Sequence, residues 1–426
     1  METIQENTII IEGKTKKIWQ TEAPEYVIVE SKDDITAGDG ARHDVILGKA
    51  EFSNTTASNV FRLLKKCDMP VAFIEKISPT KFLAEKCAMI PYEVVVRREA
   101  HGSFAKRHPE LAKRHIFSKL VIEFFLKTND KKWQGIDFPK NDPLINFQEN
   151  SVWLYLPDQP IHQQRPFAEL KQFPLCESRT AIEEIKNIAT NTFLILEKQW
   201  QLIDKTLVDL KMEFGINANG KLKLADVIDN DSWRLLDNGQ YLDKQIYRDG
   251  AELETVTAKY RMVTSLTKNF NLPRQQLIMW RASVSDDLKY FQEAIAESGT
   301  QGMCEIKTIT CSAHRELLQT FEEVITSVQE IPDSVIIAYA GRSNNLGPAL
   351  SAQTSVPVIT VPATWKEFPE DIWSSLRAPN NAPVMTVIDP KNAVLAAFQI
   401  LAMKNPRLYA KIQSVKEKGL YNTVKF

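Results

Sequence analysis

The most constraining feature of the sequence is a regular alternation of β-type and helical segments in its C-terminal part. Apolar runs typical of buried strands lie at 275–280, 303–309, 334–340, 356–362 and 382–388, and segments with helical spacing separate most of them. Such alternation predicts a parallel sheet that is covered by helices on both faces. We therefore expect an α/β three-layer domain with a parallel sheet, whose ligands bind beyond the carboxyl ends of the strands.

Polar loops follow the first three of these strands and should meet at one edge of the sheet. Ser283, Ser285 and Asp286 follow the first strand, and His314 and Arg315 follow the second. Hydroxyl groups and an arginine suit a phosphate, and Asp286 suits ribose hydroxyls. An unperturbed imidazole has a pKa of roughly 6.5, so His314 is the natural proton carrier of this edge. A purely structural histidine fits the same position equally well.

The N-terminal part alternates less regularly and contains hairpin-like pairs, which predicts an α+β domain. Residues 252–270 have helical spacing, and Asn271, Leu272 and Pro273 form a plausible helix stop. The stretch 134–177 has no clear period and predicts a long loop or insertion. We expect three parts: a first domain at 1–250, a linker helix at 251–272 and a second domain at 273–426.

The composition argues against several classes of protein. Lys and Arg total 53 against 54 Asp and Glu, and the net charge of −1 provides no field to hold nucleic acid. The first residues lack a signal-peptide pattern, and no run of about 18 apolar residues suggests a membrane span. The five cysteines lack metal-ligand spacing and argue against a disulfide framework. We expect a soluble, cytoplasmic protein without a membrane or nucleic-acid partner.

A hairpin-like pair brings charged residues together near the end of the first domain. The segments 206–216 and 221–229 are predicted strands joined by a four-residue loop, which pairs Ile216 with Lys221. Lys211 then lies opposite Asp226, and Glu213 lies diagonal to Asp226 at roughly 7–8 Å between α-carbons. Two carboxylates at that distance can share a Mg²⁺ ion that carries nucleotide phosphates. A surface ladder of Lys, Asp and Glu is an equally good interpretation.

Two further segments have the residue types of phosphate contacts. Residues 11–19 place a glycine, Lys14 and Lys16 at the start of an apolar pattern, which suits a turn over phosphates. Residues 93–103 run from a β-branched strand into a loop with Arg97 and Ser103, and arginine forks suit a phosphate monoester. A solvated basic loop also explains the second segment.

Ten short segments, taken in order, resemble the motifs of two enzyme families. GKTK (13–16), ITAGDGAR (35–42), EVVVRREAHGS (93–103), LVDLKMEFG (207–215), ADVIDNDSWRL (225–235) and DKQIYRD (243–249) resemble phosphoribosylaminoimidazole-succinocarboxamide synthetase. SVSD (283–286), SAHR (312–315), AGRSNNLGP (340–348) and VPVI (356–359) resemble the biotin-independent and ATP-independent phosphoribosylaminoimidazole carboxylase. Over nearly its whole length the chain resembles the bifunctional purine-biosynthesis family of animals.

The resemblance implies that the first domain uses ATP and Mg²⁺ to activate an imidazole carboxylate as an acyl phosphate, which the amine of L-aspartate attacks. The implied ATP contacts and metal ligands are Lys14, Lys16, Lys127, Glu213 and Asp226. Glu93 and Asp142 are implied ligands of a second metal. Asp209 and Lys211 are implied catalytic residues that contact ribose and substrate. The implied substrate-binding residues are Arg97, Ser103 and Arg234 for the ribose phosphate, with Asp39, Asp243 and Arg248 as further contacts.

For the second domain the resemblance implies addition of CO₂ to C4 of aminoimidazole ribonucleotide without biotin, with His314 moving the C4 proton. Ser283, Ser285, Asp286 and Arg315 are implied to hold the ribose phosphate. Ser343, Asn345 and Gly347 belong to a loop near the implied CO₂ pocket. The same resemblance implies a homo-octamer.

Two residues depart from the carboxylase pattern. Ala282 stands where that family usually has glycine, and Ala352 replaces a second glycine beside the same pocket. If the backbone at Ala282 required a positive φ, the methyl group would cost roughly 1–2 kcal/mol. This leaves open a functional synthetase whose second domain is an impaired carboxylase that serves as an oligomerisation scaffold. A nucleotide-binding protein without a metabolic reaction is a third interpretation.

Overall fold

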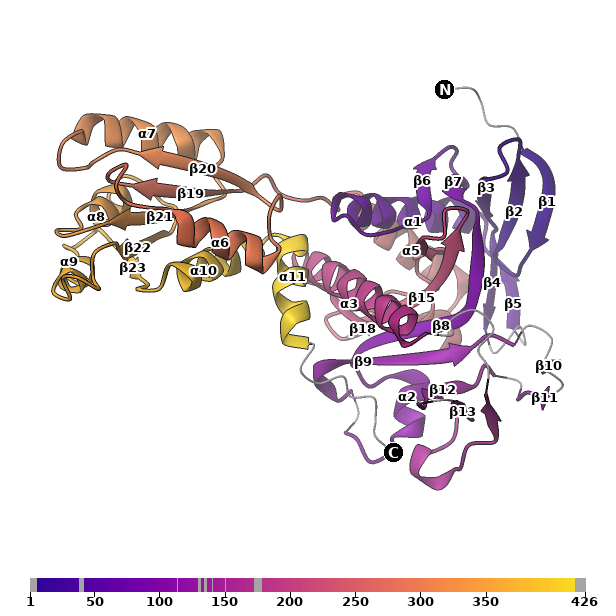
Figure 1. Cartoon of the computed structure of the whole chain (residues 1–426). Helices are drawn as coiled ribbons and strands as arrows, with labels where there is room; N and C mark the ends of the chain where they lie inside the picture. The colour runs from indigo at the N-terminus through magenta and orange to yellow at the C-terminus, as the bar shows by residue number, and fades with distance from the viewer. Residues whose placement is uncertain are drawn as a thin grey trace. The chain divides into compact units, whose positions relative to one another are not determined.

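The structure is a computed structural model of the 426-residue chain, and the residues it describes are 6–37, 42–112, 114–128, 132–133, 136–139, 141–149, 151–171 and 178–417. The chain divides into two compact units, Met1–Asn271 with Ser414–Phe426, and Leu272–Gln413 (Figure 1). The first unit is α+β and the second is α/β with a parallel sheet, which confirms the predicted fold class.

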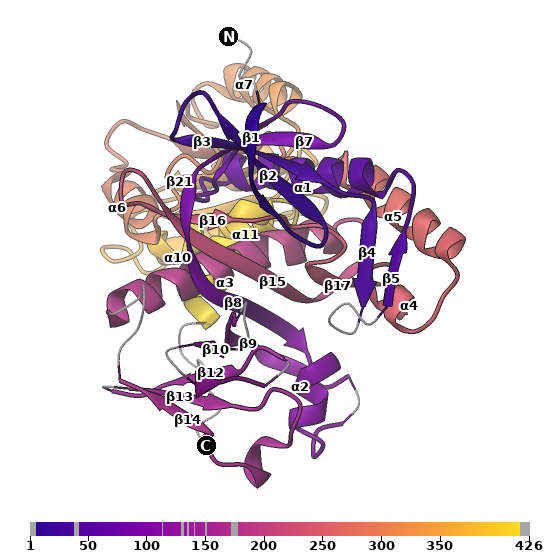
Figure 2. The same ribbon diagram turned by 90° about the vertical axis from the view of Figure 1, so that its right-hand side faces the viewer.

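A five-stranded antiparallel sheet opens the first unit, in the order β1-β2-β3-β7-β6. Helix α1 contacts β3, β6 and β7 (Figure 2), and Phe61 of this helix stacks on Phe73 of β6 with 5.6 Å between the ring centroids. Burial of this aromatic face against the sheet anchors the helix. The elements are β1 (Glu6–Glu12), β2 (Lys16–Thr21), β3 (Tyr26–Ser31), α1 (Lys49–Lys66), β6 (Phe73–Lys76) and β7 (Lys81–Glu85).

A nine-stranded sheet carries most of the predicted synthetase residues. Its order is β14-β13-β12-β9-β8-β15-β17-β18, and β16 also pairs with β15. The long central strands β8 and β15 pair antiparallel over most of their length. The strands are β8 (Cys87–Glu99), β9 (Ile116–Leu126), β12 (Leu144–Phe147), β13 (Val152–Tyr155), β14 (Ala168–Leu170), β15 (Thr206–Asn217), β16 (Leu222–Ala225), β17 (Trp233–Asp237) and β18 (Gln240–Tyr241).

Helix α3 (Arg179–Gln201) covers one face of this sheet and leaves the other to the site. Leu210 of β15 is paired with Trp233 of β17, and Trp233 makes an edge-on contact with Trp200 of α3. Leu210 therefore lies on the helix-covered face. Because side chains alternate along a strand, Asp209, Lys211 and Glu213 lie on the opposite face.

Shorter elements complete the first unit. They are the hairpin β4 (Asp34–Ala37) and β5 (Arg42–Val45), the short helix α2 (Gly102–Arg107), the pair β10 (Lys132–Trp133) and β11 (Ile136–Asp137), the 3₁₀ turn η2 (Ile161–Gln163), α4 (Gln245–Arg248) and α5 (Leu253–Thr267).

The second unit is a five-stranded parallel sheet in the order β20-β19-β21-β22-β23, with helices on both faces (Figure 1). Leu277 and Met279 of β19 pack in one core with α6 and α10, and Ile278 and Trp280 pack in a second core with α7 and α8. The elements are β19 (Gln276–Arg281), α6 (Lys289–Ser298), β20 (Glu305–Thr310), α7 (Leu317–Glu330), β21 (Ser334–Ala340), α8 (Leu346–Ser351), β22 (Val358–Pro362), α9 (Asp371–Leu376), β23 (Met385–Thr386), α10 (Pro390–Ala402) and α11 (Pro406–Glu417).

The predicted linker helix is an integral part of the first unit. In place of a connector at 251–272, α5 packs against α1, with 3.0 Å between the hydroxyls of Thr56 and Thr264. The last residues of the chain also differ from the expected division, because Ser414–Phe426 groups with the first unit. Glu417 is 2% exposed and accepts from Arg98 of β8 at 3.2 Å. The pattern of apolar residues did not predict that these C-terminal residues contact the first unit, because the contacts are polar.

The stretch 134–177 is not the long loop that we predicted. Its described residues form β12, β13 and β14 at the edge of the nine-stranded sheet, with Leu144 paired to Phe125 of β9. The three strands are only three or four residues long, so their period-two pattern is too brief to be recognised in the sequence. No helix in the described part of the chain is long and apolar enough to cross a membrane.

Candidate active sites

Asp209 lies on the middle one of three neighbouring strands of the nine-stranded sheet. This residue of β15 is paired with Arg97 of β8 on one side and with Arg234 of β17 on the other. Both guanidinium groups donate to the same oxygen, Asp209 Oδ2, at 2.7 Å from Arg97 Nη1 and 2.6 Å from Arg234 Nη1. Arg97 is only 3% exposed, whereas the side chain of Arg234 is 16% exposed. Arg234 is therefore the more accessible cation of the two.

Gly102 lies directly against Arg234 at the start of α2. Its φ is +56°, and a β-carbon built there would lie 2.3 Å from Arg234 Nη2. Nε of Arg234 is buried and has no hydrogen-bond partner among the described residues. Ser103, the next residue, is half-buried. The structure thus brings together Arg97, Ser103 and Arg234, the three residues predicted to hold the ribose phosphate.

We expect Gly102→Ala to weaken ribonucleotide binding about tenfold, because the added methyl group displaces an Arg234 guanidinium that would make a charged hydrogen bond. The measurement is KM for the carboxylated ribonucleotide in the synthetase assay. Gly220→Ala is the matched control, because Gly220 has φ of +70° but no atom within 4 Å of the built β-carbon. Both changes carry the same backbone strain of about 1–2 kcal/mol, so equal KM values would contradict the assignment.

Further along the same face, three lysines pair with three carboxylates. Lys211 Nζ donates to Glu93 Oε2 at 3.1 Å, and Lys127 Nζ donates to Glu213 Oε2 at 2.7 Å. Lys16 Nζ forms an ion pair with Asp226 Oδ1. Glu93 and Glu213 are directly opposite each other in the β8–β15 ladder. Four of these six residues lie on three different strands, β2, β8 and β15, and the other two directly follow β9 and β16, so the cluster exists only in the folded chain.

The predicted hairpin register is wrong by one residue. Ile216 pairs with Leu222, not with Lys221, and Glu213 pairs with Ala225. In this register Asp226 would face away from Glu213 if β16 continued, because a one-residue slip reverses the face. However, β16 ends at Ala225, and Asp226 adopts a left-handed φ of 63°. This turn lets Asp226 meet Lys16, whose ammonium group also interacts with Glu213.

The electrostatics of this cluster keep Glu213 ionised. Burial by itself would raise the pKa of Glu213, but Lys127, Lys211 and Lys16 outweigh it and hold the pKa below its usual value. The pKa of Asp142 is raised by burial, and the nearby Glu93 carboxylate adds to this effect. Asp142 accepts from the backbone N–H of Thr128 at 3.2 Å. That Glu93 and Asp142 share a second metal stays a prediction.

The remaining predicted residues of this unit are placed differently. Asp243 is fully buried, and its carboxylate accepts from the backbone N–H groups of Leu235 and Gln245, both at 2.7 Å. Burial raises the pKa of Asp243 to about 7. It therefore holds the backbone behind Arg234 and is not open to a substrate. Lys14 and Arg248 are exposed, and Asp39 lies outside the described residues.

In the second unit, the loops after β19 and β20, two of the three loops predicted to meet, contact each other. Arg315, after β20, donates to the carbonyl of Ala282, after β19, at 3.4 Å. Asp286 Oδ2 accepts from the backbone N–H of Ser283 at 2.9 Å, and Ser285 Oγ donates to Ser283 Oγ at 3.0 Å. His314 is exposed beside Arg315. The chain order reverses between β19 and β21, which is where such sheets bind ligands.

Ala282 does not carry the strain that the sequence suggested. The described non-glycine residues with positive φ include Arg342 and Asn381 but not Ala282. Its methyl group packs against the core that contains Trp280. Ala352 is the C-cap of α8 with φ of −69°. The backbone therefore accepts alanine at both positions, and nothing favours the impaired-carboxylase interpretation.

The loop after β21 is held by residues that sequence analysis did not select. The N–H of Arg342, which has φ of 60°, donates to Thr364 Oγ1 at 3.0 Å and to Asp371 Oδ2 at 2.8 Å. Asn344 is 2% exposed, and its amide donates to Ser375 Oγ at 3.0 Å. The selected residues Ser343 and Asn345 are exposed on the same loop. The sequence of this loop did not indicate that Asn344 is buried and anchors the loop.

Gly347 permits α8 to approach β22. A β-carbon at this position would lie 1.9 Å from Thr360 Cγ2. We expect Gly347→Ala to destabilise the second unit by about 1–3 kcal/mol, as overpacked cores do, measured as a lower melting temperature. Thr360→Ser removes the methyl group that would collide, so the double variant should recover most of the loss. Equal destabilisation in the single and double variants would refute this close contact.

The fold and the sites define the class of the protein: a nucleotide-using α+β unit followed by an α/β unit with a strand-end site. Residues 9–265 match the family model for SAICAR synthetase, and residues 278–420 match that for AIR carboxylase. The chain therefore belongs to the family of bifunctional enzymes that combine AIR carboxylase with SAICAR synthetase in purine biosynthesis.

Relatives of the full chain have both parts in the same order. The chain is 37% identical to "Multifunctional protein ADE2" of Gallus gallus, over 95% of this chain and 92% of that protein. It is 34% identical to the Homo sapiens bifunctional phosphoribosylaminoimidazole carboxylase/phosphoribosylaminoimidazole succinocarboxamide synthetase, over 95% and 92%. A type-2 SAICAR synthetase crystallised with ADP aligns with 60% of this chain and 96% of its own, at a TM-score of 0.50 and 28% identity.

Proposed function

We propose that the second unit carboxylates aminoimidazole ribonucleotide with CO₂ and that the first unit joins the product to L-aspartate with ATP. The observation that carries the synthetase assignment is the cluster in which Lys127 and Lys211 pair with Glu213 and Glu93 on one face of the nine-stranded sheet, and Lys16 of β2 pairs with Asp226 beside them. Alternating charges at such a site suit a phosphorylated nucleotide and a carboxylate substrate together.

In this proposal the ribonucleotide binds with its phosphate at Arg234, Ser103 and the edge of Arg97. Asp209 orients both guanidinium groups, because one oxygen accepts from each. Lys16 and Lys127 contact the ATP phosphates, with Lys14 as a more exposed cation. Lys211 lies between the two ends and neutralises charge that develops as the imidazole carboxylate becomes an acyl phosphate. The amine of aspartate then attacks the acyl carbon, and phosphate leaves.

Glu213 and Asp226 fit the ligand chemistry of Mg²⁺. Protein sites for Mg²⁺ use one or two carboxylates together with substrate phosphates. Among the described residues there is no group of three or more His, Cys, Asp and Glu side chains that could hold a metal by itself. The nucleotide must therefore supply the other oxygens, and Lys16 and Lys127 neutralise these carboxylates when it is absent. Glu93 and Asp142 are a second pair of the same kind, and bound Mg²⁺ would stabilise the transferred phosphoryl charge.

For carboxylation, His314 removes the C4 proton as CO₂ adds to the ring, without biotin. Ser283, Ser285, Asp286 and Arg315 hold the ribonucleotide, and the anchored loop with Ser343, Asn345 and Gly347 closes the CO₂ side. This role of His314 is supported by its position on the loop after β20, which contacts the loop after β19 beside the reversal of strand order. The reaction needs no ATP, so the two activities can be separated by leaving ATP out.

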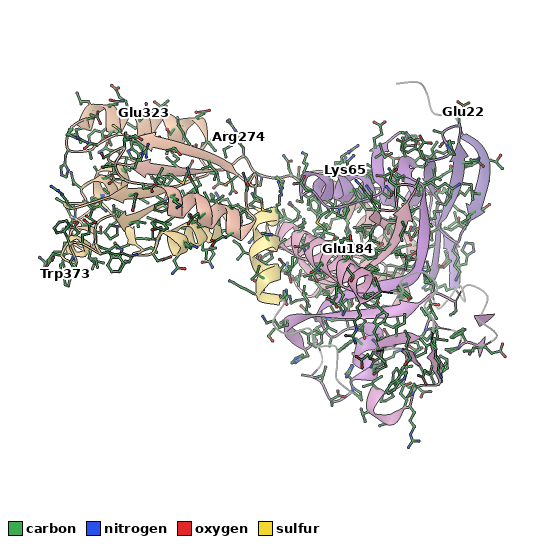
Figure 3. The ribbon with its side chains drawn as sticks, in the orientation of Figure 1. Glu22, Lys65, Glu184, Arg274, Glu323 and Trp373 are labelled. Atoms are coloured by element: carbon green, nitrogen blue, oxygen red, sulfur yellow. The ribbon has the colours of Figure 1, made fainter. Side chains whose placement is uncertain are left out.

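The second unit also has the surface of an assembling domain, which supports a homo-octamer. Large apolar side chains are exposed on it, among them Val284 at 73%, Leu318 at 78% and Trp373 at 57%, and the last of these is labelled in Figure 3. Assembly would remove such side chains from water, which is favourable. Sedimentation of the full chain tests the octamer, and a monomer at micromolar concentration would refute it.

Cys87, Cys304 and Cys311 are thiols, which suits a protein of the cytoplasm.

One assay tests the proposed pair of reactions. Aminoimidazole ribonucleotide and bicarbonate are supplied with and without ATP and aspartate, and both products are followed. We expect the carboxylated ribonucleotide without ATP, and the succinocarboxamide only when ATP and aspartate are both present. If carboxylation required ATP, or if no carboxylated product formed while added carboxylated ribonucleotide was still converted, the second-unit assignment would be wrong.

A further inference from the structure

We infer that Glu123 and Arg107, neither of which contacts a ligand, are positioning residues for the phosphate end of the synthetase site. This inference rests on the proposed role of Arg234 and Ser103 in holding the ribose phosphate. Five buried or nearly buried groups of alternating charge form one connected row. The row runs, by direct contacts, through Arg107, Glu123, Arg97, Asp209 and Arg234.

The inner end of the row is closed to solvent. Arg107 is 0% exposed, and its Nη1 donates to the carbonyl of Pro157 at 2.6 Å while Nη2 donates to Glu123. Its guanidinium lies 5.4 Å from the ring centroid of Phe125. A cation enclosed in this way cannot reach a substrate. Any effect of Arg107 on binding must pass through the residues it holds.

Glu123 links Arg107 to Arg97 by hydrogen bonds to both. Its Oε2 accepts from Arg97 Nε at 2.7 Å, and its other oxygen accepts from Arg107. Glu123 remains ionised, because Arg107 and Arg97 outweigh the burial that would raise its pKa. Arg97 is thereby gripped on two sides, by Glu123 at Nε and by Asp209 at Nη1. A planar guanidinium held at two donors has a fixed orientation.

Arg107 also acts on the site through the backbone. It ends the short helix α2, whose first residues are Gly102 and Ser103. Gly102 lies against the guanidinium of Arg234. Arg107 thus fixes the C-terminal end of α2, the helix that carries Ser103. It also fixes one end of the row of charged residues that leads to Arg234. Three cations against two carboxylates leave the row with one positive charge in excess, which suits an incoming phosphate.

The test compares the carboxylated ribonucleotide with its dephosphorylated nucleoside as substrates of the full-length chain. In Glu123→Gln and Arg107→Lys, we expect KM for the ribonucleotide to rise about tenfold, as expected when a hydrogen bond to a charged group is lost. The conversion of the nucleoside at a given concentration should stay within about twofold of wild type, because it has no phosphate to lose. The KM for ATP should also be unchanged.

Glu197→Gln is the matched control. Glu197 of α3 accepts from Arg98 at 2.6 Å, and Arg98 is the neighbour of Arg97 on β8 but points to the opposite face. This variant breaks a partly buried arginine–glutamate pair of the same kind on the other side of the strand. It should lower the melting temperature without changing the preference for the phosphorylated substrate.

The outcomes separate the inference from the proposed function. If Glu123→Gln or Arg107→Lys reduces activity on both substrates equally, or only lowers the melting temperature, the positioning role is wrong. Arg107→Lys keeps the buried charge, so it remains informative if Glu123→Gln does not fold. Arg234→Ala should abolish the preference for the phosphorylated substrate. If that variant keeps the preference, the proposed phosphate site itself fails, whatever the two positioning variants do.

Discussion

Replacing Glu213 or Asp226 by alanine is expected to lower ATP-dependent synthesis of the succinocarboxamide by about 10²-fold or more, the loss typical when one preorganised electrostatic contact is removed. Each carboxylate is paired with a lysine and is proposed to bind the nucleotide metal, so its loss leaves Lys127 or Lys16 without its partner. The measurement is the rate of succinocarboxamide formation from added carboxylated ribonucleotide at saturating Mg²⁺ and ATP.

ATP-independent carboxylation by the same preparation is the internal control, because the second unit carries that reaction. Glu169→Ala serves as a second control, since Glu169 is an exposed residue of β14 at the far edge of the same sheet. Glu213→Gln and Asp226→Asn keep the size of the side chains and the left-handed turn at residue 226, and they should lose the same activity. Normal synthetase turnover in both alanine variants would remove these residues from the nucleotide site.

His314→Asn is expected to lower carboxylation by about 10²–10⁴-fold, the contribution typical of a positioned general acid–base group. The imidazole is exposed beside Arg315 at the edge where the loops of β19 and β20 meet. Asparagine keeps polarity and approximate size but cannot move the proton. The measurement is carboxylated product formed without ATP, with synthetase activity on added carboxylated ribonucleotide as the control that should not change.

Ala282→Gly gives a contrasting variant in the same assay. Because Ala282 has no positive φ and its methyl group packs on the core near Trp280, glycine should not improve binding and should cost a little stability. An inactive wild type that becomes active in Ala282→Gly would instead support the scaffold interpretation. Full carboxylase activity in His314→Asn would show that another group moves the proton.

Local patterns explain which predictions of the fold were right. The strand predicted at 334–340 is β21, Ser334–Ala340, because a wholly buried parallel strand is a continuous apolar run with polar ends. The prediction of a loop at 134–177 was wrong because the strands β12, β13 and β14 are only three or four residues long. Such strands are too short to show a periodic pattern in the sequence. The two units divide after Asn271, and α5 belongs to the first unit because of contacts with α1, which is distant in sequence.

The candidate site shows the same distinction at the level of single residues. The alternation in LVDLKMEFG correctly puts Asp209, Lys211 and Glu213 on one face, because pleating depends only on local geometry. In the observed hairpin register five residues, not the predicted four, lie between the paired Ile216 and Leu222, and a shift of one residue changes every cross-strand partner. Asp226 meets the cluster because it leaves the strand in a left-handed turn, a conformation that its sequence context did not indicate.

The sequence by itself determined the two-part organisation, the alternating faces of the strands and the residue types able to bind phosphate and metal, because these follow from local periodicity and side-chain chemistry. Only the tertiary structure decided which of these residues meet. Arg97 and Asp209 are 112 positions apart, and Lys16 and Asp226 are 210 positions apart. Arg107 and Glu123 acquire their proposed importance only through such contacts. Burial turned Asp243, a predicted substrate contact, into a support for the backbone, because the packing around a side chain depends on the whole fold.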